Sequence, residues 1–164
     1  MIADELQRAL NRLPHGPEFR FVDRLIELDP GKSAIGEYRV RGDEIFLKGH
    51  FPGHPLMPGV LLIEAVAQLA GVVAQSAPNI PPLADLKLTA LRGVKIFGSA
   101  RPGQVVTLKA RLTGRLGSLI QASGEILSGD QKLLIADITL SGGLVEPPVG
   151  RMPWSPPITS PDAS

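Results

Sequence analysis

Residues 49–68 read GHFPGHPLMPGVLLIEAVAQ, and the apolar run that starts at residue 60 continues to residue 74. The first half is dense in Gly and Pro, which predicts an irregular loop. The second half is interrupted only by Glu64 and Gln68. It is too long for a typical strand and apolar on every side, so it predicts a buried helix. Pro58 suits the first turn of that helix, where its missing N–H would have no acceptor.

Working outward, the rest of the chain reads mainly as antiparallel sheet. Apolar and polar residues alternate with a period of two in the second half, most cleanly at 106–113. The predicted strands are residues 19–28, 32–40, 86–97, 106–113, 120–126 and 134–140, with turns at 29–31, 114–117 and 128–130. A short amphipathic helix is predicted at 4–12. The fold class is therefore α+β, with edge strands that a second subunit could pair with.

Length and composition limit the class of protein. The 164 residues predict one domain over residues 1–143, followed by a Pro-rich tail over residues 144–164 that we expect to be disordered. The net charge is only +1 and aromatic residues make up 4%, which argues against nucleic-acid binding. The absence of Cys excludes disulfides, thiolate metal sites and a cysteine nucleophile. With no signal peptide or membrane span in the sequence, we expect a cytoplasmic protein.

Three features of the quoted stretch could carry chemistry. Glu64 and Gln68 lie one turn apart on the same helix face, and burial favours a neutral carboxyl that can donate a proton. His50 lies in a loop stiffened by prolines, a good mount for a base. The N–H of Gly59 lies at the positive end of the helix dipole and could bind an oxyanion. Each residue also has a structural interpretation: a solvent-reaching Glu, an exposed His and a plain turn Gly. No role is predicted for His15 or His54.

A base, an acid and an oxyanion donor together suit removal of a proton next to a carbonyl and loss of a β-leaving group. The stretch 49–68 closely resembles the signature of the β-hydroxyacyl-acyl-carrier-protein dehydratases of bacterial fatty-acid synthesis (FabZ type, related to FabA). The segments Leu13-Pro14-His15, Phe21-Val22-Asp23-Arg24, Val94-Lys95-Ile96 and Arg101-Pro102-Gly103 extend the resemblance over residues 10–141.

The resemblance implies a hot-dog fold, in which a sheet wraps around a central helix and two subunits pair edge to edge. It also implies that His50 is the base and Glu64 the acid, contributed by opposite subunits of a homodimer. By motif position, the Gly59 N–H would hold the thioester carbonyl and Gln68 would orient the acid. The family's reaction converts a (3R)-3-hydroxyacyl thioester on acyl carrier protein to the trans-2-enoyl thioester. No cofactor and no metal are expected. A trimer of dimers is a further assembly consistent with the family.

The chain departs from the family at two places. Residues 16–19 read Gly-Pro-Glu-Phe, where the family has a basic-aromatic-proline sequence after its Leu-Pro-His. Residues 97–100 read Phe-Gly-Ser-Ala, where the family often has consecutive basic residues. Binding of an acidic carrier protein would then fall to Arg92, Lys95 and Arg101, which could equally be ordinary solvated charges.

Alternatives to the carrier-protein dehydratase follow from these departures. The same chemistry could act on CoA thioesters or on polyketide-type chains. A hot-dog thioesterase fits less well, because hydrolysis needs a placed water or nucleophile. A non-catalytic acyl-binding protein is the alternative from outside the enzymes, and retention of His50, Glu64 and Gly59 together argues against it.

Overall fold

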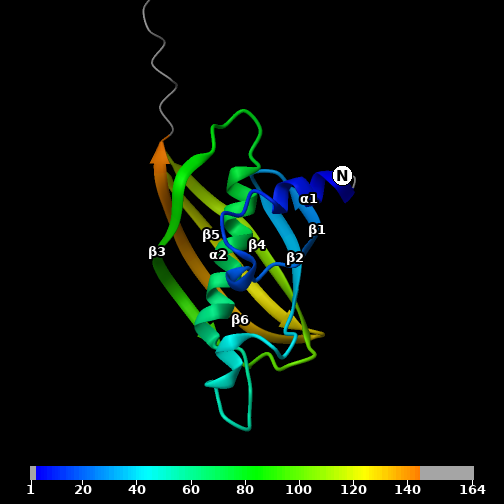
Figure 1. The fold of residues 1–164 in the computed structure, drawn as a ribbon. Helices are drawn as coiled ribbons and strands as arrows, with labels where there is room; N and C mark the ends of the chain where they lie inside the picture. Colours follow the sequence, from blue (N-terminus) through cyan, green and yellow to red (C-terminus); the bar gives the residue numbers. More distant parts are fainter. Residues whose placement is uncertain (1–2, 145–164) are drawn as a thin grey trace, which may run out of the picture.

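The computed structural model describes residues 3–144, which form one six-stranded antiparallel sheet around a long helix (Figure 1). The helices are α1 (Ala3–Leu10) and α2 (Gly59–Gln75), with 3-10 turns η1 (Pro17–Phe19) and η2 (Ile45–Lys48). The strands are β1 (Arg24–Asp29), β2 (Ser33–Arg39), β3 (Leu83–Ile96), β4 (Val105–Leu116), β5 (Leu119–Ser128) and β6 (Gln131–Leu144). Their order in the sheet is β1-β2-β4-β5-β6-β3.

Helix α2 lies against one face of the sheet, and the α+β hot-dog prediction is confirmed (Figure 1). Its apolar residues from Leu62 to Ala74 are mostly buried because β2, β4, β5 and β6 all pack against it. Close approach of helix and sheet requires a glycine at Gly124, since an added Cβ would overlap Val66. Within residues 3–144, no helix is long and apolar enough to cross a membrane.

The alternation of apolar and polar residues in the second half of the sequence also predicts the strands there correctly. Val106, Leu108 and Ala110 are buried, whereas the intervening residues of β4 point away from α2. The turn predicted at 114–117 is wrong in detail, because β4 continues to Leu116. Gly114 instead lies at a bulge in the β4–β5 pairing, and Gly117, at φ +56°, takes the turn.

The first predicted strand is also shorter than expected. Residues 19–22 do not join the sheet: the first backbone bond to β2 runs from the Asp23 N–H to the Glu37 carbonyl at 2.8 Å, and the strand starts at Arg24. The Phe19 carbonyl and the Phe21 N–H are instead hydrogen-bonded to the side chain of Gln68 on α2. The predicted tail lies outside the described residues, apart from Leu144, which is the last residue of β6.

Candidate active site

Helix α2 places Glu64 and Gln68 on one face, one turn apart. The side chain of Gln68 is 2% exposed, yet each of its polar atoms has a partner. Its Oε1 accepts the Phe21 N–H at 2.8 Å, and its Nε2 donates to the Phe19 carbonyl at 2.8 Å and to Glu64 Oε1 at 3.1 Å. Gln68 therefore ties the catalytic candidate Glu64 to the segment before β1.

His15 lies beside the same carboxyl group. Its Nε2 is 3.3 Å from Glu64 Oε1, and the two side chains are 28% and 21% exposed. No pattern in the sequence pointed to this contact, since the two residues are far apart along the chain. The only available signal was that His15 follows Leu13-Pro14 within a segment that resembles the dehydratase family.

His50 is held by the loop between η2 and α2. Its Nδ1 is 3.0 Å from the Leu56 carbonyl oxygen, and its ring stacks on Phe51 with centroids 4.1 Å apart. A carbonyl can only accept, so this contact assigns a proton to Nδ1. In the neutral imidazole, Nε2 then carries the free lone pair, which is the arrangement that a general base requires.

The chain segment leading into this loop is anchored by Glu44. Its carboxylate accepts hydrogen bonds from the Tyr38 hydroxyl at 2.8 Å and from the N–H groups of Arg41 and Gly42 at 2.8 and 2.7 Å. Burial acts to raise the pKa of Glu44, but these donors outweigh it and leave the pKa below its ordinary value. Burial, together with the bond to Glu44, raises the pKa of Tyr38.

Gly59 is the first residue of α2, directly after the N-cap Pro58. The N–H groups of the first helical turn have no intrahelical acceptor, and they carry the positive end of the helix dipole. Within residues 3–144, the Gly59 N–H donates to no backbone carbonyl. It is therefore free to bind an oxygen atom of a ligand.

A pocket of about 640 Å³ opens next to Glu64. It runs along one face of α2 past Ala67 and Gly71 to Gln75. Leu83, Leu86, Leu88 and Leu140 supply apolar walls, and His15 and Gln68 also line it. Neither His50 nor Gly59 is among its lining residues. Within one chain, the structure thus brings together Glu64, Gln68 and His15 but does not place His50 in their pocket.

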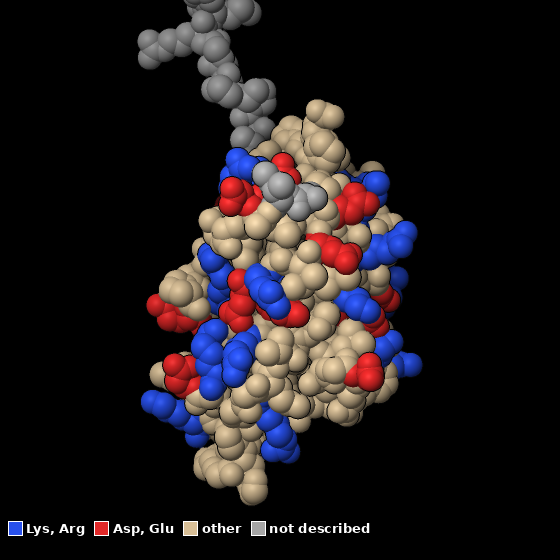
Figure 2. Space-filling model, turned by 90° about the vertical axis from the view of Figure 1, so that its right-hand side faces the viewer, with Lys and Arg blue, Asp and Glu red and all other residues tan. Residues whose placement is uncertain are grey.

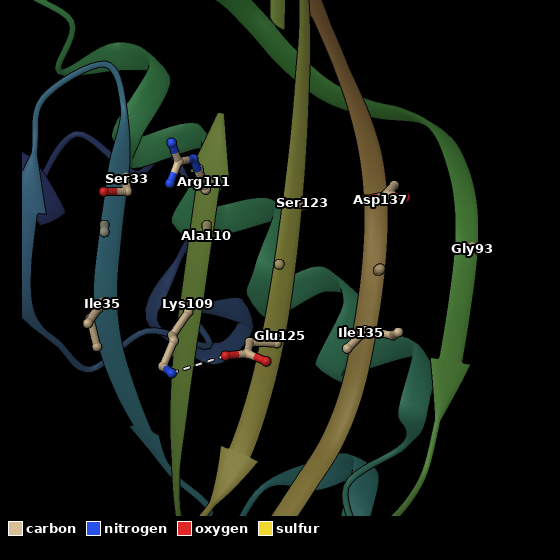
Figure 3. Close-up of a pocket in the computed structure, with 13 residues that line it drawn as sticks. Ser33, Ile35, Gly93, Lys109, Ala110, Arg111, Ser123, Glu125, Ile135 and Asp137 are labelled. Atoms are coloured by element: carbon tan, nitrogen blue, oxygen red, sulfur yellow. Dashed lines mark hydrogen bonds and ion pairs between the residues drawn. The ribbon is translucent and has the colours of Figure 1, made fainter. Parts of the chain in front are cut away.

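A second pocket, of about 470 Å³, lies on the sheet face that points away from α2 (Figure 3). Two of its charged lining residues form an ion pair, in which Glu125 accepts from Lys109 at 3.0 Å. Lys132, which lies outside the lining, also donates to Glu125 at 2.9 Å. Hydrogen bonds from Lys132 and Lys109 lower the pKa of Glu125. This pocket contains no histidine and none of the predicted site residues, so it does not carry the predicted chemistry.

The three basic residues predicted to bind a carrier protein are all exposed. Arg92 and Lys95 lie on β3, and Arg101 lies in the turn before β4. None of the three forms an ion pair within the described part of the chain. On the side of the molecule that carries β1 and β2, acidic and basic residues are interspersed (Figure 2). Residues 3–144 contain no cluster of three or more His, Asp or Glu that could hold a metal ion.

Comparison with known proteins shows the family to which the chain belongs. The FabA-like domain family matches residues 13–137. A 3-hydroxyacyl-[acyl-carrier-protein] dehydratase FabZ from Natranaerobius thermophilus is 40% identical over 137 residues, which cover 82% of this chain and 92% of that protein. A protein of the same name from Myxococcus xanthus is 37% identical over 123 residues, which cover 73% and 79%.

Solved structures share the fold at much lower identity. The dehydratase heterocomplex ApeI:P from Xenorhabdus doucetiae matches with a TM-score of 0.69 and 19% identity, covering 82% of this chain and 91% of that chain. Zebra fish thioesterase superfamily member 2 matches with a TM-score of 0.61 and 13% identity, covering 83% and 92%. These likenesses establish the fold alone, since one neighbour is named a dehydratase and the other a thioesterase.

Proposed function

Because this chain belongs to the FabA-like family, we propose that it is a 3-hydroxyacyl-[acyl-carrier-protein] dehydratase, which converts (3R)-3-hydroxyacyl thioesters to trans-2-enoyl thioesters in fatty acid biosynthesis. The observation that carries this proposal is the pairing of Glu64 with Gln68 beside an apolar pocket, within the signature that resembles the family.

The proposed reaction uses three groups of the chain. His50 Nε2 removes a proton from C2 of the substrate while the Gly59 N–H stabilises negative charge on the thioester oxygen. The electron pair left by the C2–H bond forms the C2=C3 double bond. The C3–O bond breaks as neutral Glu64 gives its proton to the departing hydroxyl, which leaves as water. The proton on His50 then returns to Glu64, directly or through solvent, and the resting state is restored.

The acyl chain would lie in the pocket along α2. Ala67 and Gly71 follow Glu64 on the helix face that lines it. Ala67 carries only a methyl group and Gly71 has no side chain, so the groove stays open. Leucines of β3 and β6 form the opposite wall. Burial of methylene groups on such a surface contributes ~0.8 kcal/mol per CH₂, so the groove would favour an extended apolar substituent.

We propose that the working unit is a homodimer. Neither His50 nor Gly59 lines the pocket that contains Glu64, so a partner subunit would supply both the base and the oxyanion donor. Strand β3 is an edge of the sheet over its whole length, and edges pair readily with a second copy. Large exposed apolar side chains lie on or next to this edge: Leu91, Ile96 and Phe97. Further assembly into a trimer of dimers and a cytoplasmic location stay predictions.

The substrate carrier is the second part of the proposal. Exposed Arg92, Lys95 and Arg101 could attract an acidic carrier protein that delivers the substrate on its phosphopantetheine arm. The segment Phe97-Gly98-Ser99-Ala100 has no basic residue, and this specific departure keeps CoA thioesters as the second candidate substrate class.

The test is turnover of one short 3-hydroxyacyl thioester, presented on acyl carrier protein and, in parallel, on CoA or a pantetheine analogue. Formation of the enoyl product, lost in His50→Ala, would support the dehydratase, and the ratio of the two rates would name the carrier. Absence of turnover on either carrier, with a folded dimeric protein, would overturn the proposal in favour of a non-catalytic acyl-binding protein.

A further inference from the structure

Two nitrogen atoms contact the same oxygen atom of Glu64. Gln68 Nε2 donates to Oε1 at 3.1 Å, and His15 Nε2 lies 3.3 Å from that atom. No hydrogen bond or ion pair to Oε2 occurs within residues 3–144. The two oxygens of one carboxyl group thus have different surroundings, and the proton that the proposed reaction requires must reside on one of them.

The orientation of the Gln68 amide is determined by the backbone. The Phe21 N–H can only donate, so the amide oxygen of Gln68 must face it. The Phe19 carbonyl can only accept, so the amide nitrogen must face it and, with its second hydrogen, Glu64. Glu64 Oε1 therefore accepts a hydrogen bond from Gln68. When the carboxyl group is neutral, the oxygen that accepts is its carbonyl oxygen, so the acidic proton lies on Oε2.

The surroundings of His15 indicate which of its nitrogens carries hydrogen. Nδ1 is buried and has no hydrogen-bond partner within the described residues. A hydrogen there would be a buried, unsatisfied donor, which is costly. With the hydrogen on Nε2 instead, the imidazole presents a donor to Glu64 Oε1. The ring is also stacked on Phe19, with centroids 6.3 Å apart, so its plane is restrained.

We propose that His15 is a positioning residue for Glu64, an inference that rests on the proposed function. Neutral His15 carries its hydrogen on Nε2. His15 Nε2 and Gln68 Nε2 then both donate to Glu64 Oε1, which accepts two hydrogen bonds. The acidic proton is thereby confined to Oε2, the oxygen left free for the substrate hydroxyl. The 3.3 Å contact is longer than a well-formed hydrogen bond, and contacts of this kind commonly tighten when substrate binds.

The first arm of the test is independent of activity. The ¹⁵N resonances of the three histidine rings, assigned with His15→Gln and His54→Gln, report which ring nitrogen is protonated. We expect His15 as the Nε2–H tautomer, whereas His50 should be the Nδ1–H tautomer because it faces the Leu56 carbonyl. His50 therefore serves as an internal contrast. An Nδ1–H tautomer at His15 would overturn the inference.

The second arm is kinetic and compares two substitutions. His15→Phe keeps a ring on Phe19 but removes the donor, and we expect kcat to fall about ten- to a hundredfold with KM nearly unchanged. His15→Gln places an amide nitrogen near the Nε2 position and should restore most of kcat. His54→Gln is the matched control, since His54 is exposed on the 49–58 loop, and it should retain wild-type kcat.

The outcomes separate the inference from the function beneath it. Equal losses in His15→Phe and His15→Gln, at unchanged melting temperature, would overturn the positioning role, as would wild-type kcat in His15→Phe. If wild-type protein turns over no 3-hydroxyacyl thioester, the proposed dehydratase fails and the catalytic role of His15 fails with it. In that case the tautomer measurement still decides whether His15 donates to Glu64.

Discussion

The terminal methyl group of Ile96 occupies the space in which a side chain at Gly59 would start: a Cβ added there would lie 2.6 Å from Ile96 Cδ1. The end of β3 is thus packed directly against the first residue of α2. Because Ile96 is half-exposed and its methyl group is at the end of a flexible chain, shortening Ile96 makes room for substitutions at residue 59.

The role of the Gly59 N–H can be isolated with a matched pair in the Ile96→Ala background. Gly59→Ala adds a Cβ and keeps the N–H, whereas Gly59→Pro adds a ring and removes it. Proline is tolerated at the first position of a helix, and Pro58 has the extended conformation that a following proline requires. We expect kcat for Gly59→Pro to be about 10²–10³-fold below that for Gly59→Ala. Equal rates in the two folded variants would refute an oxyanion role.

Sharing of the site between subunits predicts complementation. His50→Ala and Glu64→Ala should each lose at least about a hundredfold in activity as separate proteins. Randomly mixed subunits would restore one intact site in every mixed dimer, so the mixture should regain about a quarter of wild-type activity if the sites are related by two-fold symmetry. The measurement is the rate after unfolding and refolding the two variants together. Refolding each variant alone is the control, and no recovery in the mixture would place both residues in one chain.

Removal of the Gln68 side chain should destabilise the fold as well as disorder Glu64. Gln68→Leu leaves the Phe21 N–H and the Phe19 carbonyl without their partner, and each buried unsatisfied group costs ~1–3 kcal/mol. Urea denaturation should therefore show a loss of about 2–4 kcal/mol. Gln75→Leu is a matched stability control. Gln75 lies on the same helix as Gln68, and its side chain bonds in the same reciprocal way to the N–H and carbonyl of Leu83 on β3. A loss below that of an ordinary surface substitution would contradict the assignment.

The groove along α2 predicts a simple change of chain-length preference. An added Cβ at Gly71 would meet only Leu86, at 3.8 Å, so a larger side chain fits there but fills the pocket. Gly71→Leu should leave kcat/KM for a short acyl thioester within about twofold and lower it at least tenfold for a long one, since ~1.4 kcal/mol of lost binding is a factor of ten. The assay is kcat/KM across a chain-length series. A parallel decrease for every length would show that the acyl chain lies elsewhere.

The segment that leads into the His50 loop should make the free energy of unfolding depend on pH through Glu44. Its folded pKa lies below the ordinary value of 4.5, so its ionised form stabilises the native state. That contribution is fully present above the unfolded pKa and is lost as the pH falls through the folded pKa. Glu44→Gln should thus cost about 1–2 kcal/mol near neutral pH and progressively less below about pH 4.5. The check is urea unfolding of both proteins across this range.

A suitable control for this pH series is Glu18→Gln. Glu18 is exposed, and it forms no hydrogen bond or ion pair within the described residues. Its unfolding free energy should follow the wild-type curve at every pH. If the difference between wild-type protein and Glu44→Gln stays constant with pH, the ionised carboxylate of Glu44 is not what stabilises this segment.

Much of the architecture could be predicted from local patterns. The apolar run at 60–74 predicted α2 within one residue at each end, and strict alternation predicted β4, β5 and β6. These patterns predict structure because an element that buries one face must repeat its apolar residues with the period of a helix or a strand. The prediction failed where a side chain took the place of a neighbouring strand as hydrogen-bond partner. Gln68 binds the backbone at residues 19–21, so β1 starts only at Arg24.

The sequence by itself determined the helix, the strand alternation and the identities of His50, Glu64, Gly59 and Gln68 as candidates, because each depends on residue type and short-range spacing. Only the tertiary structure decided that His15 meets Glu64, that β3 forms the edge next to β6, and that the pocket beside Glu64 lacks His50. These relationships join residues far apart in the chain. They depend on the path of the backbone between them, and no local periodicity encodes that path.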